Sequence, residues 1–131
     1  MSTADFQHIK ANMVGDVAVV EVMSKELRFP PQCQELESEL NLIAGQDWAN
    51  HLLINLGRTR YVCSTGFGVL VNLVKKVKTQ GREIKFSDMD PAVRLGAEII
   101  GLDKVAEIHD TEHEALKAFS SDDSAGPAFA T

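Results

Sequence analysis

The hydroxyl groups of Ser64 and Thr65 stand where a strand-like apolar run gives way to a helical pattern. A hydroxyl at the amino end of a helix can accept hydrogen bonds from the free backbone N–H groups of the first turn. The same end of a helix also attracts anions, so a phosphate group on one of these hydroxyls would be tolerated there. Residue chemistry alone favours a helix cap and leaves a phosphorylation site open.

Cys63 directly precedes Ser64, and the amino end of a helix can activate a thiol for catalysis. A phosphatase-type loop would need an arginine six positions further on, where Val69 stands, and no C-x-x-C motif is present. We therefore expect Cys63 to be a small buried residue at the end of a strand. Cys33 is expected to be a core residue on the apolar side of a helix.

Other chemical motifs are incomplete. Gly66-x-Gly68 lacks the third glycine of a dinucleotide-binding motif, because Val71 stands in its place, and no G-x-x-x-x-G-K-[ST] phosphate loop occurs. His109 and His113 are four residues apart, but His109 precedes the expected start of a helix and no third metal ligand is apparent. We expect no catalytic residues, no cofactor and no metal site.

The composition narrows the class of partner. The chain has 131 residues, 44% of them hydrophobic, and a net charge of −6. An acidic surface repels phosphate backbones and anionic lipid, which argues against a nucleic-acid or membrane partner. No run approaches the ~20 apolar residues of a membrane span, and the first residues lack the apolar core of a secretory signal. With only two cysteines, a reducing, cytoplasmic location is expected.

Hydrophobic periodicity predicts strands that alternate with helices. Strands are expected at 6–13, 16–23, 51–56, 82–87 and 105–108, and Gly15-Asp16 should turn the first two into a hairpin. Helices are expected at 31–44, 66–80 and 91–100, and after the capping box Thr111-x-x-Glu114. This order predicts an α/β fold in which one mixed β-sheet is flanked by about four α-helices.

Residues 66–80 form the clearest helical pattern. Its apolar positions recur on one face, which should be buried: Val69, Leu70, Leu73, Val74 and Val77. Residues 1–119 are expected to form a single domain. Residues 120–131 are polar and contain Gly and Pro, so we interpret them as a flexible C-terminal tail.

Three segments carry a family resemblance. The first is 61–70, YVCSTGFGVL, which resembles the strand-to-helix turn of STAS domains, the family of bacterial anti-sigma factor antagonists and of the cytosolic domains of sulfate transporters. The second is DPAVR at 90–94, followed by IGLD at 100–103, and the third is DTEHEAL at 110–116. All three occur in the family's order and at similar spacing.

The resemblance implies a STAS-like domain that switches protein partners and is not an enzyme. In the antagonist branch, the first serine of the turn is phosphorylated by an ATP-binding anti-sigma factor that is also a serine kinase. The unphosphorylated antagonist sequesters that anti-sigma factor, which regulates transcription, and a phosphatase resets the switch. Ser64 stands at the matching position, and Thr65 is a weaker candidate for phosphorylation.

The residues around Ser64 are then expected to contact the partner. They are Thr65, Phe67, Gly68, Val71 and Arg28.

Two positions depart from the family pattern. Cys63 replaces the acidic residue that usually precedes the phosphorylated serine, and Arg28 lies near a customary Asp at the end of the second predicted strand.

Two rival hypotheses remain. One is a STAS-like scaffold whose Ser64 is never phosphorylated, and the other is a small-ligand or nucleotide sensor. The second draws some support from Arg58 and Arg60.

Overall fold

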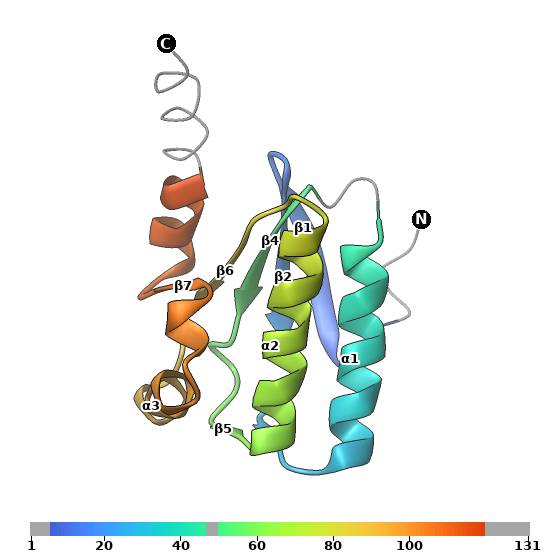
Figure 1. Cartoon of the computed structure of the whole chain (residues 1–131), viewed down its shortest axis with the longest axis vertical. Coiled ribbons are helices and arrows are strands. Elements are labelled where there is room, and N and C mark those ends of the chain that lie inside the picture. Colours follow the sequence, from blue (N-terminus) through green and yellow to red (C-terminus); the bar gives the residue numbers. More distant parts are fainter. Residues whose placement is uncertain (1–5, 47–49, 120–131) are drawn as a thin grey trace.

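The computed structural model of the chain describes residues 6–46 and 50–119. Strands and helices alternate along it, as the sequence predicts (Figure 1). The strands are β1 (Ile9–Val14), β2 (Val17–Val22), β3 (Glu26–Leu27), β4 (His51–Asn55), β5 (Tyr61–Val62), β6 (Ile84–Ser87) and β7 (Glu107–His109). The helices are α1 (Pro30–Ala44), α2 (Ser64–Thr79), α3 (Pro91–Ile100), a 3-10 turn at Leu102–Lys104 and a helical segment at 112–119.

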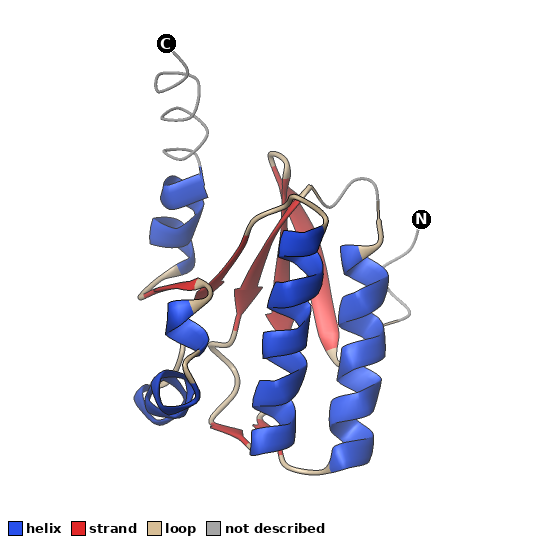
Figure 2. Cartoon of the chain, in the orientation of Figure 1, coloured by secondary structure: helices blue, strands red, loops and turns tan. Residues whose placement is uncertain are grey.

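The main sheet has five strands in the order β1-β2-β4-β6-β7 (Figure 2). β1 and β2 are antiparallel, and Gly15 adopts a positive φ of 62° in the turn between them. The other neighbours are parallel. The predicted fold class, a mixed sheet flanked by helices, is confirmed.

Helices α1 and α2 lie side by side over one face of this sheet (Figure 1). The predicted apolar face of α2 is buried here, and Leu73 is only 2% exposed. The sheet contributes alternate residues to the same core, among them Val20, Ile54 and Phe86. This large core fixes the direction of α2, and therefore the position of its first residue.

The opposite face of the sheet is covered by the segment 112–119. Ala115 and Phe119 pack there on Val17, Val19 and Leu53. The predicted capping box is half formed, because the backbone N–H of residue 114 donates to the hydroxyl at 111 over 3.1 Å.

Lys85 lies on this covered face opposite Leu53, and its side chain is only 2% exposed. Its ammonium group lies 3.0 Å from a carboxylate oxygen of Glu107 and 4.9 Å from the centroid of the Phe119 ring. The alternation predicted for residues 82–87 is therefore present, but two of its polar residues, Lys85 and Ser87, are also buried.

A second, two-stranded sheet pairs β3 with β5 in parallel. The sequence places residues 25–28 at the end of the second predicted strand, and this is wrong. β2 ends at Val22, and Leu27 pairs separately with Val62. The short ribbon anchors the segment that leads into α2.

Helix α3 has the ends that the sequence predicts. The side chain of Asp90 accepts a hydrogen bond from the N–H of Ala92 at 3.1 Å, and Gly101 closes the helix in a left-handed conformation at φ 89°. α3 packs against β5.

Within the described residues, none of the helices combines the length and apolar character needed to cross a bilayer. The predicted tail at 120–131 lies outside the described residues.

Candidate functional site

Ser64 is the first residue of α2, and its side chain is exposed, as is that of Thr65. The residue in the N-cap position is Cys63, which makes no side-chain capping hydrogen bond. The first helical bond runs from the N–H of Phe67 to the carbonyl of Cys63 at 3.0 Å. The N–H groups of the first turn therefore point out of the helix beside the Ser64 hydroxyl, as at any helix amino end.

The backbone before Ser64 is held in place by the β3 segment. The N–H of Cys63 donates to the carbonyl of Leu27 at 2.8 Å, and the N–H of Arg60 donates to the carbonyl of Lys25 at 2.7 Å. These bonds hold the chain on both sides of β5 against the β3 segment, so the backbone that presents Ser64 is fixed by β3.

The residues predicted to contact a partner differ in their exposure to solvent. Thr65 and Arg28 are exposed, and Gly68 has open space where a side chain would begin, with no atom within 4 Å of the position that a Cβ would take. Val71 is half-buried. Residues three and four apart share a helix face, so Gly68 and Val71 lie on the Ser64 side of α2. We call Ser64, Thr65, Gly68, Val71 and Arg28 the Ser64 face.

The structure places Phe67 in the core and not on this surface. Its side chain is 5% exposed. A Cβ atom on Gly96 of α3 would lie 2.9 Å from Cε2 of the Phe67 ring, so the ring packs directly against that glycine. The prediction that Phe67 reaches a partner from the surface therefore needs correction, because α3 covers the ring.

A shallow apolar hollow of about 330 Å³ adjoins the Ser64 face. It runs between the end of β5 and α3, and its lining includes Tyr61, Phe67, Leu95 and Ile99. Leu95 is 59% exposed and Ile99 is 77% exposed. The sequence prediction missed both residues, although the signal was present: α3 has apolar residues on more sides than the core can bury.

The charge of Arg28 is balanced locally. Its guanidinium lies 2.7 Å from the carboxylate of Glu26 and 4.4 Å from the centroid of the Tyr61 ring. The hydrogen bond from Arg28, aided by its positive charge, lowers the pKa of Glu26. Arg28 thus replaces a customary acidic residue without leaving a strongly positive spot beside Ser64.

Arg58 and Arg60 are also paired with carboxylates. Arg58 lies 3.1 Å from Glu21, and Arg60 lies 3.9 Å from Asp90 while donating to the carbonyl of Gly57 at 2.7 Å. These arginines therefore do not form a ready anion pocket at the start of α2.

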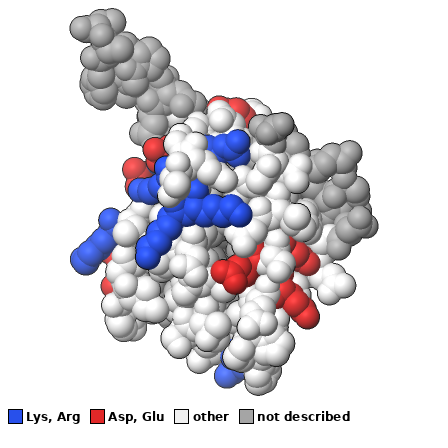
Figure 3. All heavy atoms as spheres, turned by 45° about the vertical axis from the view of Figure 1, so that its right-hand side comes forward, with Lys and Arg blue, Asp and Glu red and all other residues white. Residues whose placement is uncertain are grey.

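Charged side chains gather away from this end of the molecule on the face that Figure 3 shows. The lower part of that view, the end at which α2 begins in Figure 1, is mainly uncharged. The exposed lysines of α2 lie in its later turns, at Lys75, Lys76 and Lys78. On this face, charged side chains are few at the Ser64 end.

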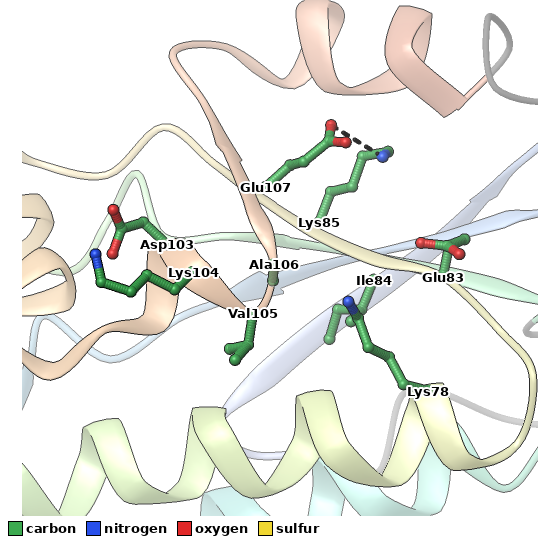
Figure 4. Close-up of a pocket in the computed structure, with 9 residues that line it drawn as sticks. All are labelled: Lys78, Glu83, Ile84, Lys85, Asp103, Lys104, Val105, Ala106 and Glu107. Carbon is green, nitrogen blue, oxygen red and sulfur yellow. Dashed lines mark hydrogen bonds and ion pairs between the residues drawn. The ribbon is translucent and has the colours of Figure 1, made fainter.

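A second hollow, of about 200 Å³, lies at the edge of the sheet between β6 and β7 (Figure 4). Its positively charged groups do not converge. Lys85 points toward Glu107 and the helix above, Lys78 lies on the other side of the strands, and Lys104 lies apart from both, on the 3-10 turn. Among the described residues, no cluster of three or more His, Cys, Asp or Glu side chains could hold a metal ion. Nothing in this hollow favours a nucleotide.

Comparison with known proteins identifies the type of domain. The family model of the STAS domain matches residues 14–115. An anti-sigma F factor antagonist of Paenibacillus polymyxa is 30% identical over 66 residues, which make up 50% of this chain and 56% of the relative. The matched region thus spans little more than half of that relative.

Solved structures share the fold. An anti-sigma factor antagonist from Mycobacterium paratuberculosis superposes with a TM-score of 0.71 at 25% identity, over 84% of this chain and 91% of that one. The phosphorylated form of the Bacillus cell fate determinant SpoIIAA superposes with a TM-score of 0.63 at 18% identity, over 85% of this chain and 98% of that one.

Proposed function

Because the chain belongs to the STAS domain family, we propose that it is a phosphorylation-controlled binding module of the anti-sigma factor antagonist type. In its unphosphorylated form it captures an anti-sigma factor that is also an ATP-dependent serine kinase, and so regulates transcription. Phosphorylation of Ser64 releases that partner, and a phosphatase restores the first state. The module acts in the cytoplasm and catalyses no reaction itself.

The observation that carries the proposal is the position of Ser64. It is exposed at the first turn of α2, on a backbone tied to β3 by hydrogen bonds at Cys63 and Arg60. A kinase can reach such a hydroxyl without unfolding the domain. The amino end of the helix also tolerates the added negative charge, so phosphate changes the surface and leaves the fold intact. SpoIIAA, which shares this fold, exists in a phosphorylated form.

The switch works through the charge of the contact surface. Phosphate adds roughly −1.5 to −2 charges at one point. The nearby guanidinium groups of Arg28, Arg58 and Arg60 already lie against carboxylates, so they are poorly placed to neutralise it. A partner that buries Ser64 would have to desolvate this charge, which is costly unless the partner supplies a cation.

The apolar hollow beside Ser64 gives the partner a place to anchor. Leu95 and Ile99 are exposed aliphatic side chains, and aliphatic or aromatic groups of a partner would bury them. The hollow supplies affinity, and Ser64, two residues after Val62 in the lining of the hollow, supplies control. Phe67 contributes from beneath by holding α3 in position.

The test is a titration of four samples against a partner recovered from the native host by pull-down. The samples are wild type, Ser64→Ala, Ser64→Asp and wild type phosphorylated on Ser64. We expect Ser64→Ala to bind like the wild type, and the phosphorylated protein to bind about 5–150-fold more weakly. Ser64→Asp should follow the phosphorylated protein in part, because a carboxylate carries less charge than a phosphate.

Thr65→Ala serves as the matched control, since it removes a neighbouring exposed hydroxyl and leaves Ser64 intact. It should remain a substrate of the kinase and should release the partner on phosphorylation. Equal affinity across all four samples would refute the switch and leave an unregulated scaffold. Intact-mass analysis of protein from the native host would show whether Ser64 carries phosphate in the cell.

A further inference from the structure

Two thiols lie in contact beneath Ser64. The sulfur atoms of Cys33 and Cys63 are 3.9 Å apart, although the residues are 30 positions apart in the chain. Cys33 is buried in the first turns of α1, and Cys63 is partly exposed immediately before α2. The sequence led us to expect two unrelated structural cysteines, and the structure brings them together.

The backbone on both sides holds the sulfurs in this position. Cys63 donates its N–H to Leu27 at 2.8 Å and accepts a hydrogen bond from Phe67 at 3.0 Å. Gly66 lies at the same junction, because a Cβ atom there would lie 2.8 Å from Cγ1 of Val62 and 3.7 Å from the sulfur of Cys33. The pair is therefore built into the junction of α1, β5 and α2.

The two thiols have different surroundings. Burial and the hydrogen bond to Cys63 raise the pKa of Cys33 to about 11, so this thiol keeps its proton at neutral pH. Cys63 is the sulfur that a solute can reach, because it is partly exposed immediately before α2 whereas Cys33 is buried. This arrangement suits an accessible sulfur that reacts first and a buried sulfur that resolves the product.

We propose that Cys63 and Cys33 form an oxidation site for hydroperoxides that closes to an intrachain disulfide. The sulfur of Cys63 attacks one peroxide oxygen and the O–O bond breaks. Cys63 becomes a sulfenic acid, while the other oxygen takes the thiol proton and leaves as an alcohol or as water. The sulfur of Cys33 then attacks the sulfur of Cys63, and the hydroxyl group leaves as water with the proton of Cys33. Two thiols are oxidised and one peroxide is reduced.

Closing the bond requires the sulfurs to approach from 3.9 Å to about 2 Å. The side chains must rotate, and the start of α2 must move slightly toward α1. The disulfide would then tie the two helices together one residue before Ser64. Reversible disulfides of this kind suit a reducing compartment, in which disulfides are usually transient or redox-sensing. The site does not depend on the function proposed for Ser64.

The test exposes the full-length reduced protein to hydrogen peroxide at neutral pH and follows free thiols and intact mass. We expect both thiols to disappear together, with the loss of two hydrogen atoms from a monomer and full recovery in dithiothreitol. A peptide map should show Cys33 joined to Cys63. Addition of oxygen to Cys63 while Cys33 stays free, cross-links between chains only, or two thiols that survive the peroxide would each overturn the proposal.

Single variants separate the two roles. Cys33→Ala leaves Cys63 without a resolving thiol, so its sulfenic acid should persist and react with dimedone. Cys63→Ala leaves only the buried thiol, which should react with neither peroxide nor dimedone. Fast oxidation of Cys33 in the second variant would contradict the assigned roles. The wild-type mass experiment decides the proposal even if a variant fails to fold.

Discussion

Two glycines in the first turns of α2 have opposite surroundings, and this difference gives a sharp prediction. A Cβ atom at Gly66 would lie 2.8 Å from Cγ1 of Val62 and 3.5 Å from Cβ of Leu27. A Cβ atom at Gly68 would meet nothing within 4 Å. Neither glycine has a positive φ, so alanine fits the backbone at both positions. The two substitutions therefore differ only in what the new methyl group contacts.

The magnitudes follow from two opposing effects. Alanine is favoured over glycine in a helix by up to about 1 kcal/mol. Overpacking a tight core costs about 1–3 kcal/mol, and at position 66 the methyl group must displace the stiff, buried side chain of Val62. We expect Gly68→Ala to raise the free energy of unfolding by roughly 0.5–1 kcal/mol. Gly66→Ala should lower it by about 1 kcal/mol.

Urea denaturation followed by circular dichroism measures both variants against the wild type. The unfolding midpoints should move in opposite directions, with unchanged slopes that show the same surface being exposed. If Gly66→Ala proves as stable as Gly68→Ala, the tight contact between α2 and β5 is not present in solution. Gly68→Ala also probes the Ser64 face: its methyl group should weaken partner binding while the protein becomes more stable, so unfolding cannot explain the loss.

Further outcomes follow from packing and charge. Leu73→Ala should lower the free energy of unfolding by about 2–5 kcal/mol in the same denaturation assay, and a loss below about 0.5 kcal/mol would show that α2 presents another face to the core. Ile99→Asp should weaken partner binding in the titration, whereas Leu42→Asp, at another exposed apolar position on α1, should not. The hydrogen bond from Lys85 lowers the pKa of Glu107 below its ordinary value near 4.5, so the folded state binds this proton less readily than the unfolded state. The stability contributed by Glu107 should be present above about pH 4.5 and be lost as the pH falls further, and Glu107→Gln should flatten that part of the curve of stability against pH. An unchanged acid slope in that variant would mean that the ion pair does not persist in solution.

Local signals in the sequence predicted the ends of the main elements well. Gly15 allows the positive φ that the β1–β2 turn requires, and Gly101 does the same at the end of α3. Asp90 and Pro91 mark the start of α3 because their effects act on the neighbouring backbone. Such signals depend on a few adjacent residues, so one sequence is enough to interpret them.

Features that depend on distant contacts were harder to predict. Phe67 is buried because Gly96, on another helix, leaves room for its ring. β3 and β5 are two residues each, too short for a periodic pattern, and they exist because Leu27 and Val62 pair in register. Lys85 is buried because the segment 112–119 covers its side of the sheet. Ser64 itself was placed by resemblance, since residue types alone favoured a helix cap.

The helical segment 112–119 covers the face of the main sheet opposite α1 and α2, and its late position in the chain has a consequence for synthesis of the protein. Val17, Val19 and Leu53 are translated well before Ala115 and Phe119, the residues that shield them. At about 5–20 residues per second, a ribosome needs several seconds to extend the chain from one group to the other. During that interval an apolar strip of the sheet remains open to water. We expect nascent chains to engage a holding chaperone until the last described helix docks.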